Sequence, residues 1–336
     1  MNKLEIISIV DEILSGFSKI HGTVLIAKND EVILHQSFSY LGAPLKVDKY
    51  SQYLIASITK QFTAAALLKA LYDNLALDAL HNPIAYWLRS THPIWDDAMP
   101  GWANQVTLHH LLTHTSGIKN LYEALEFQPS EKYAYCNIGY TLLGAVIEEI
   151  ALEPLNAYFE RTLFLPANMH DTGLPLCGTP ADLKNNPKFQ KLALGFERLD
   201  FHNNSEYSDQ SEKLSFDKSS ASGGVISTVY DLAKWNHALY QGKIIPLFLV
   251  EYMTKKYVQK DAYSYYDGFE KLWYGYGLDI FEENNRKIYQ HCGGLAGYQS
   301  KISYNPHTKV TIVNLSNVAE ENPPIFAFTN YLREVL

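Results

Sequence analysis

A serine and a lysine three residues apart, Ser57 and Lys60, begin a run of strong helix formers that continues to Leu71. Residues three apart on a helix share a face, so the hydroxyl and the amine can lie within hydrogen-bonding distance. A serine at a helix start also lies among unpaired backbone N–H groups, which stabilise a developing oxyanion. The pair predicts an activated serine nucleophile, although a capping serine beside an exposed lysine has the same pattern.

Metal chemistry is less favoured by the sequence. His110 and His114 are four residues apart, but the glutamate that would complete a zinc-protease motif is missing. The three cysteines, Cys136, Cys177 and Cys292, lack the paired spacing of a zinc site, and their odd number does not indicate a disulfide framework. We therefore expect neither a metal nor another cofactor.

The composition is that of a folded protein with a sizeable core. The chain has 336 residues, of which 47% are hydrophobic and 19% charged, and this length allows one large domain or two intimate ones. The formal net charge is -8, and Lys and Arg form no run. Nucleic acid and anionic membrane surfaces are therefore not expected as partners. The expected partner is a small molecule or a short peptide. The sequence leaves the oligomeric state open.

The first twenty residues have an apolar pattern that contains Glu5, Asp11 and Glu12. These acids are unsuited to a secretion signal and typical of an amphipathic helix, predicted over 4–17. No uninterrupted apolar run is long enough to cross a bilayer. The chain as given is expected in the cytoplasm, and the alternative is a periplasmic protein whose signal has been removed.

The elements that must position the serine and the lysine follow from periodicity and turn residues. Asn29 and Asp30 join two β-rich runs, 22–28 and 31–38, which is a hairpin signal. Further strands are predicted over 273–281, 287–291, 298–304 and 309–315. Helices are predicted over 107–114 with Thr107 as cap, from about 138 to 150 with Tyr135 and Asn137 just before it, over 155–165, from about 229, and over 324–335. The polar stretch 174–222 is predicted to be a long surface loop or lid.

Strands at both ends and helices between them predict an α+β fold, in which both chain ends build one antiparallel sheet flanked by helices. The middle of the chain then forms a mainly helical insertion. We expect a single unit over 1–336, with an α/β part at about 1–56 and 223–336 and a mainly helical part at about 57–222.

Three short motifs, read together, resemble those of a known superfamily. They are Ser57 with Lys60, Tyr135 with Asn137, and His291 with Gly293. In this order the chain resembles the serine β-lactamase and penicillin-binding-protein superfamily, and within it the branch of class C β-lactamases, related esterases and D-amino-acid peptidases. Flanking segments extend the resemblance over nearly the whole chain: LLTHTSGI, GYTLLGAVIE, PANMHDTG, SGGVISTVYDLAKW and VNLSN.

The resemblance implies a β-lactamase/transpeptidase fold with its active site in a cleft between the two parts. It implies that Ser57 is the acylated nucleophile, that Lys60 lowers the cost of deprotonating it, and that Tyr135 is the base. Which of Lys60 and Tyr135 operates as the base stays open, because either group is the kind of activation that covalent catalysis needs.

The same resemblance implies roles in substrate binding. Asn137 would hold the amide or carbonyl of the substrate. His291 would lie on the strand wall and orient Tyr135 or a substrate carboxylate. Gly293 belongs to the third motif, and the backbone N–H groups of Ser57 and Gly294 would form the oxyanion hole.

The chain departs from the commonest family pattern in two places. His291 stands where lysine is usual, as in members with esterase or peptidase activity, so strong β-lactamase activity is not expected and activity should vary with pH in the range of histidine. Cys136 and Cys292 occupy the middle positions of the second and third motifs. They are either small core residues or, if exposed in the cleft, sites of thiol sensitivity.

The leading hypothesis is a serine hydrolase that acts through an acyl-enzyme on an ester, an amide of a D-amino-acid peptide, or a β-lactam. The alternative is a catalytically inactive protein that keeps the fold and acts as a binding or sensor protein. A Ser, His, Asp hydrolase built on Ser116 and His114 is a weaker alternative, because the chain has no Gly-x-Ser-x-Gly elbow.

Overall fold

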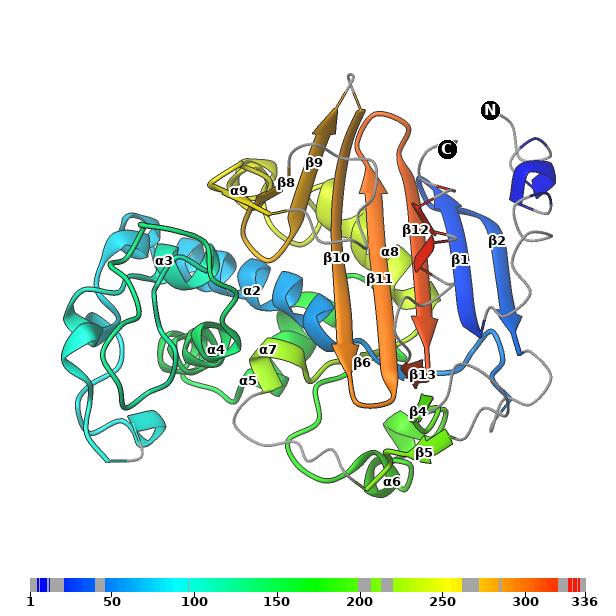
Figure 1. Ribbon diagram of the computed structural model, residues 1–336. Coiled ribbons are helices and arrows are strands. Elements are labelled where there is room, and N and C mark those ends of the chain that lie inside the picture. Colours follow the sequence, from blue (N-terminus) through cyan, green and yellow to red (C-terminus); the bar gives the residue numbers. More distant parts are fainter. Residues whose placement is uncertain are drawn as a thin grey trace.

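The structure is a computed structural model, viewed as a ribbon in Figure 1. It describes these residues: 5, 7–10, 12, 21–39, 46–95, 97–198, 207–212, 220–261, 272–283, 286–319, 326, 327, 329, 330 and 332.

An antiparallel sheet of eight strands forms the centre of the molecule, and its strand order is β2-β1-β12-β11-β10-β9-β8-β7. The strands are β1 (Gly22–Lys28), β2 (Glu31–Phe38), β7 (Val258–Lys260), β8 (Leu272–Tyr274), β9 (Asp279–Glu283), β10 (Arg286–Leu295), β11 (Tyr298–Asn305) and β12 (Val310–Ser316). Because β1 pairs with β12, the two ends of the chain meet in one sheet. The predicted α+β fold with a sheet built from both ends is confirmed.

The described helices are α2 (Thr59–Asp73), α3 (Leu108–Leu112), α4 (Asn137–Ala151), α5 (Leu155–Phe159), α6 (Pro180–Leu183), α7 (Ser220–Gly223), α8 (Val229–Tyr240) and α9 (Leu247–Met253). In Figure 1 helices α2 to α5 lie at the left of the sheet, α8 lies behind it, and α6 lies below it. One π-helical turn, η6 (Glu160–Phe164), extends α5, so the predicted helix over 155–165 is present in two forms. Helix α8 packs on β1 and β12.

Short elements connect these helices and strands. The 3-10 turns are η1 (Ala56–Ile58), η2 (Leu77–His81), η3 (Ile84–Tyr86), η4 (Pro93–Trp95), η5 (Gly101–Asn104) and η7 (Pro187–Phe189). Two small sheets complete the fold, one of β3 (Tyr53–Leu54) with β6 (Ile226–Ser227), the other of β13 (Val318–Ala319), β4 (Phe196–Arg198) and β5 (Tyr207–Asp209).

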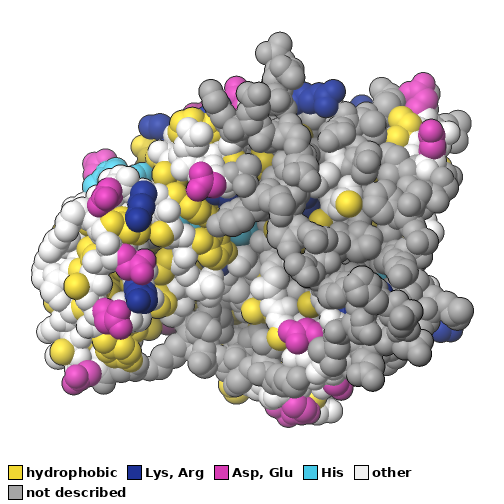
Figure 2. Space-filling model, viewed as in Figure 1, with side chains coloured by type: hydrophobic (Ala, Val, Ile, Leu, Met, Phe, Trp, Pro, Cys, Tyr) yellow, Lys and Arg dark blue, Asp and Glu magenta, His cyan; other side chains and the backbone are white. Residues whose placement is uncertain are grey.

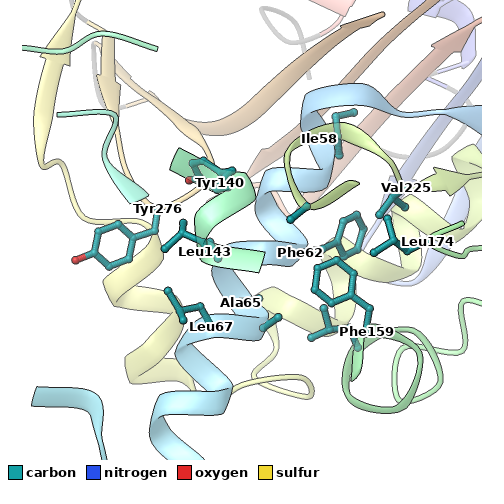
Figure 3. Close-up of a cluster of buried hydrophobic side chains, with 14 of the residues drawn as sticks. Ile58, Phe62, Ala65, Leu67, Tyr140, Leu143, Phe159, Leu174, Val225 and Tyr276 are labelled. Carbon is teal, nitrogen blue, oxygen red and sulfur yellow. The ribbon is translucent and has the colours of Figure 1, made fainter. Parts of the chain in front are cut away.

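Helix α2 runs through the core and is buried on all sides except near its last turn. Its buried residues include Lys60 and Gln61 as well as the apolar ones. Figure 3 shows its side chains, Phe62 and Ala65 among them, surrounded by residues from α4, α5 and the segment before α8. A helix that is enclosed in this way carries any polar group on it out of water. The run of helix formers after Ser57 is therefore a helix enclosed by the core.

One predicted strand, over 273–281, is wrong as a continuous element. The structure divides it into β8 and β9, which pair with each other across a turn. Gly277 has a φ of +74°, and the N–H of Gly275 donates to the carbonyl of Leu278. The positive φ that this turn requires suits glycine, so the chain reverses where the sequence pattern alone reads as extended.

The prediction of a long loop over 174–222 is also wrong in part. Within this segment α6, η7, β4, β5 and α7 are regular elements, and β4 pairs in parallel with β13. Residues 199–206 and 213–219 lie outside the described part of the chain, and so do most of 4–17 and of 324–335. The described residues near the N-terminus, 7–10 and 12 among them, are helical.

The surface agrees with the modest net charge. On the face drawn in Figure 2, acidic and basic side chains are interspersed among the described residues. None of the helices in the described part of the chain combines the length and the apolar character needed to span a bilayer.

Phe62 allows a test of the buried α2 helix. Its ring is fully buried. The centre of the ring lies 4.3 Å from that of Trp235 and 5.5 Å from that of Phe164. We expect Phe62→Ala to lower the free energy of unfolding by about 3–5 kcal/mol in urea denaturation, because the surroundings collapse only partly into the cavity. The matched control is Phe248→Ala, at a residue that is 42% exposed. An equal loss in both variants would contradict the burial of α2.

Candidate active site

Ser57 lies in the η1 turn, directly before α2 and directly after a residue with a strained backbone. Ala56 has a φ of +47°, which non-glycine residues rarely adopt. The neighbouring carbonyl of Ile55 accepts a hydrogen bond from Ser300 Oγ on β11, at 2.7 Å. Two elements therefore fix the turn, the sheet on one side and α2 on the other. Ser57 does not cap the helix. The N-cap residue of α2 is Ile58, and no side chain makes a capping hydrogen bond there.

The amine of Lys60 is surrounded by polar atoms from three parts of the chain. Its Nζ lies 3.0 Å from Ser57 Oγ, 2.8 Å from Asn137 Oδ1 and 2.7 Å from the carbonyl oxygen of Ser222. The residue has no exposed surface. Burial disfavours the charged ammonium and lowers the pKa of Lys60 to about 7. At neutral pH a large fraction of this amine is therefore uncharged.

The hydrogen bonds around a neutral Lys60 can be assigned from donor and acceptor counts. A neutral amine has two N–H donors and one lone pair. Asn137 Oδ1 and the carbonyl of Ser222 only accept, so they take both N–H groups. In this protonation state the lone pair is left for Ser57 Oγ, 3.0 Å away, and can accept the hydroxyl proton. This is the arrangement that a general base requires.

Tyr135 completes the surroundings of the serine. Its hydroxyl donates to Ser57 Oγ at 2.7 Å. The ring lies 4.8 Å from Lys60 Nζ and the residue is 40% exposed. Burial at the hydroxyl end raises the pKa of Tyr135 well above its usual range, so the phenol keeps its proton at neutral pH. Tyr135 is thus a donor to Ser57, whereas the amine of Lys60 is the acceptor.

Asn137 is brought to the site by the start of α4, in the position predicted from the sequence. It is the first residue of that helix, and its N-cap is Cys136. The side chain is exposed except where its oxygen receives the Lys60 amine. One short segment, 135–137, therefore supplies both a donor to the serine and an acceptor for the lysine.

His291 lies behind this group rather than in contact with the serine. It is 4% exposed on β10; its Nε2 is 3.1 Å from the hydroxyl of Tyr274, and its Nδ1 is 2.6 Å from the carbonyl of Cys292. The carbonyl can only accept, so Nδ1 carries the proton and Nε2 accepts from Tyr274. Burial lowers the pKa of His291 to about 4, although the charge of Asp279 acts in the opposite direction. The expectation that this histidine titrates near neutrality is wrong.

A buried ion pair lies beside His291 and was not foreseen from the sequence. Lys260 Nζ of β7 is 2.6 Å from Asp279 Oδ1 of β9, and both side chains are almost fully buried. The lysine also lies 5.5 Å from the ring centres of Tyr133 and Tyr274. Lys260 and Asp279 belong to no recognisable sequence motif. They meet because β7 and β9, which are separated along the chain, lie close together in the sheet.

The two glycines of the third motif have different surroundings. A Cβ on Gly293 would come within 2.4 Å of the Ile55 carbonyl oxygen and of Ser300 Oγ, so only glycine allows β10 to lie this close to the serine turn. A Cβ on Gly294 would meet nothing within 4 Å. Gly294 therefore borders open space at the end of β10, next to the turn that holds Ser57.

Other candidate groups are not assembled into a second centre. Ser116 is 1% exposed and accepts a hydrogen bond from the N–H of Ile118. Cys136 is buried in the main core, and burial raises the pKa of its thiol; Cys292 packs against smaller apolar clusters. Across the residues that the structure describes, no group of three or more His, Cys, Asp or Glu side chains is placed to hold a metal ion.

Sequence reasoning missed several residues that contact the site. Ser222 acts through its backbone carbonyl, to which side-chain type gives no clue. The hydroxyl of Tyr274 contacts His291. Tyr274 lies in a strand, and nothing in the sequence around it indicates a role in a site. The ring of His114 lies 4.3 Å from that of Tyr135, a contact that the spacing of the histidines along the chain does not indicate.

Comparison with curated proteins gives two relatives that match most of this chain. Penicillin-binding protein 4* of Bacillus subtilis is 27% identical over 361 aligned positions, which cover 95% of the chain and 73% of that protein. Protein flp of Staphylococcus aureus is 24% identical over 333 positions, which cover 90% of the chain. The chain spans 60% of the length of flp, so both relatives are longer proteins.

Comparison with solved structures supports the predicted β-lactamase/transpeptidase fold. The D-amino acid amidase of Ochrobactrum anthropi, determined with D-phenylalanine, superimposes with a TM-score of 0.74 over 98% of both chains at 19% sequence identity. A likeness at this identity concerns the fold.

The family follows from the whole length of the sequence and not from the site alone. The family model described as Beta-lactamase matches residues 10–333. This range includes the Ser57 turn, the 135–137 segment and the glycines of β10. The chain therefore belongs to the Beta-lactamase family.

Proposed function

We propose that this chain is a serine hydrolase that acts through an acyl-enzyme on Ser57. One observation carries the proposal: the Ser57 hydroxyl lies between the Lys60 amine, at 3.0 Å, and the Tyr135 hydroxyl, at 2.7 Å. A base with a pKa near neutrality and a protonated donor on the same oxygen are what nucleophilic attack and leaving-group departure each require.

In the acylation step, Ser57 Oγ attacks the substrate carbonyl carbon while its proton passes to Lys60 Nζ. The carbonyl oxygen becomes an oxyanion, for which the N–H groups of Ser57 and Gly294 are the proposed donors. When the tetrahedral intermediate collapses, the bond to the leaving group breaks and that group takes a proton from Tyr135. Lys60 then returns its proton to Tyr135, and the enzyme is left acylated on Ser57.

Deacylation uses both groups in the same roles, with water as the nucleophile. Water loses a proton to Lys60 and attacks the acyl carbon, and Ser57 Oγ leaves with a proton from Tyr135. Lys60 then returns its proton to Tyr135, which restores the free enzyme. The proposal thus assigns the base to Lys60 and the donor to Tyr135, a choice that the sequence leaves open. It rests on opposite effects of burial, which lowers the pKa of an amine and raises that of a phenol.

The substrate that fits this site best is an uncharged ester or an amide of a D-amino acid or short peptide. His291 is buried and neutral and so offers no fixed positive charge to a carboxylate. For this reason a β-lactam, which carries a carboxylate, is the less favoured candidate. An amide is proposed as well as an ester because the D-amino acid amidase has a similar fold. A binding or sensor protein of the same fold is the alternative function.

Covalent labelling tests the nucleophile. We expect incubation with a fluorophosphonate to add one reagent-derived mass to the protein in intact-protein mass spectrometry, and Ser57→Ala to abolish the addition. The matched control is Ser116→Ala, which removes a buried serine hydroxyl and leaves Ser57 in place. Parallel incubations with 4-nitrophenyl acetate, a D-alanyl peptide and a penicillin show which acyl donor leaves an adduct or is turned over.

Each result of the labelling experiment has a definite meaning. Labelling or turnover lost in Ser57→Ala and kept in Ser116→Ala supports the proposal. Labelling that survives in Ser57→Ala places the nucleophile elsewhere. No labelling and no turnover with any of the probes would favour the binding-protein alternative.

The pH dependence tests the base. Lys60 accepts a proton only when its amine is neutral, so the acylation rate should rise with pH through about 7 and level off above it. At pH 6 the rate should be about a tenth of its plateau, since only that fraction of the amine is neutral. We expect stopped-flow acylation by 4-nitrophenyl acetate to follow this curve, and His291→Asn to leave its midpoint in place. A midpoint near 4 or near 10 would contradict Lys60 as the base.

A further inference from the structure

We propose that His114 is a positioning residue that holds Tyr135 against Ser57. The inference rests on the proposed function and adds a residue to it. His114 follows α3 in the chain, is fully buried, and has a φ of +56°. This conformation is costly for a residue with a side chain and persists where the surroundings fix it.

Two hydrogen bonds attach His114 to the residues on either side of Tyr135. The N–H of Ala134 donates to the His114 carbonyl at 2.8 Å. The N–H of Cys136 donates to His114 Nδ1 at 3.1 Å. The backbone of Tyr135 is therefore held from both sides by one residue, and the side chain and main chain of that residue each contribute one bond.

The imidazole also contacts the Tyr135 ring directly. The two ring centres are 4.3 Å apart, and the planes are inclined by 36°. Ring contact limits the tilt of the phenol, whereas the two hydrogen bonds limit the movement of its backbone. Together they fix the direction of a hydroxyl that lies 2.7 Å from Ser57 Oγ. Displacement of a catalytic group by about 1 Å can reduce a rate about a hundredfold.

The surroundings of His114 keep it uncharged. Because Nδ1 accepts from Cys136, the proton is on Nε2. Burial is the main cause that lowers the pKa of His114 well below its usual range, and the nearby side chains of Lys60 and Lys260 act in the same direction. A histidine that stays neutral is free to serve as an acceptor and a ring contact over the whole working range of pH.

The position of His114 is itself fixed by the helices on either side. Thr107 and His110 form a capping box at the start of α3. At the other end, the hydroxyl of Tyr140 on α4 donates to the carbonyl of Leu112 at 2.9 Å. The same α4 begins with Asn137, the partner of Lys60. The end of α3 and the start of α4 are thus joined on both sides of Tyr135.

Two substitutions separate the two contacts. Asn carries an oxygen at the position of Nδ1 and tolerates positive φ, so His114→Asn keeps the acceptor and removes the ring. His114→Phe keeps a ring and removes the acceptor. We expect each to lower the rate constant for labelling of Ser57 by a fluorophosphonate about ten- to hundredfold. Thermal unfolding of each variant establishes that it is folded at the assay temperature.

A double-mutant cycle distinguishes positioning from general destabilisation. If His114 acts through Tyr135, the same substitutions made in a Tyr135→Phe background should change the labelling rate by no more than about twofold. The matched control is His21→Asn, which removes another buried histidine, bonded to Asn317, and should leave the rate unchanged.

Three results would overturn the inference. They are equal losses in both backgrounds, no loss when His114 is replaced, or a Tyr135→Phe protein that reacts as fast as the unchanged one. The first two leave the proposed function intact, because the unchanged protein still reacts at Ser57. The third would also remove Tyr135 as the proposed donor, and would leave Ser57 as the nucleophile. An unchanged protein that is neither labelled nor active would overturn the proposed function, and this inference with it.

Discussion

The removal of the Lys60 amine from water is the physical constraint on which the site depends. The amine is hydrogen-bonded to groups that the fold supplies: Asn137 at the start of α4, the Ser222 carbonyl and Ser57 itself. The fall of its pKa from 10.5 to about 7 corresponds to about 5 kcal/mol against the charged form. Burial of the amine makes its charged form less stable. For this reason the amine is partly neutral, and can act as a base, at neutral pH.

The other titratable groups near Lys60 are arranged so that no second uncompensated charge accumulates. His114 and His291 are buried and neutral, each with a backbone partner on Nδ1. The positive charge of Lys260 is balanced by Asp279 at 2.6 Å. A further unpaired cation here would lower the pKa of Lys60 still more, whereas an unpaired anion would raise it. Burial, and not a neighbouring charge, is the main cause of the lowered pKa of Lys60.

Local pattern predicted the main helices and strands, whereas the β-lactamase/transpeptidase fold and the roles of Tyr135 and Asn137 were predicted from the resemblance to a known superfamily. The hairpin at Asn29, the helix after Ser57 and the helix that begins with Asn137 all carry strong periodicity or turn signals. The ion pair of Lys260 and the place of His291 behind Tyr274 depend on how distant strands align, which spacing along one chain does not contain. Burial decided the pKa of His291, and burial is a property of the assembled sheet.

Because the site residues come from three places in the chain (Ser57 with Lys60, Tyr135, and Gly294), the site exists only where the sheet and the helices meet. Its geometry is set by contacts that also stabilise the fold, such as the bond from Ser300 to Ile55 beside the serine turn. Phe62 lies two residues beyond Lys60 on the same enclosed helix. Loosening that helix would admit water to the amine and raise its pKa toward that of an exposed lysine. Core packing and basicity are therefore two consequences of the same burial.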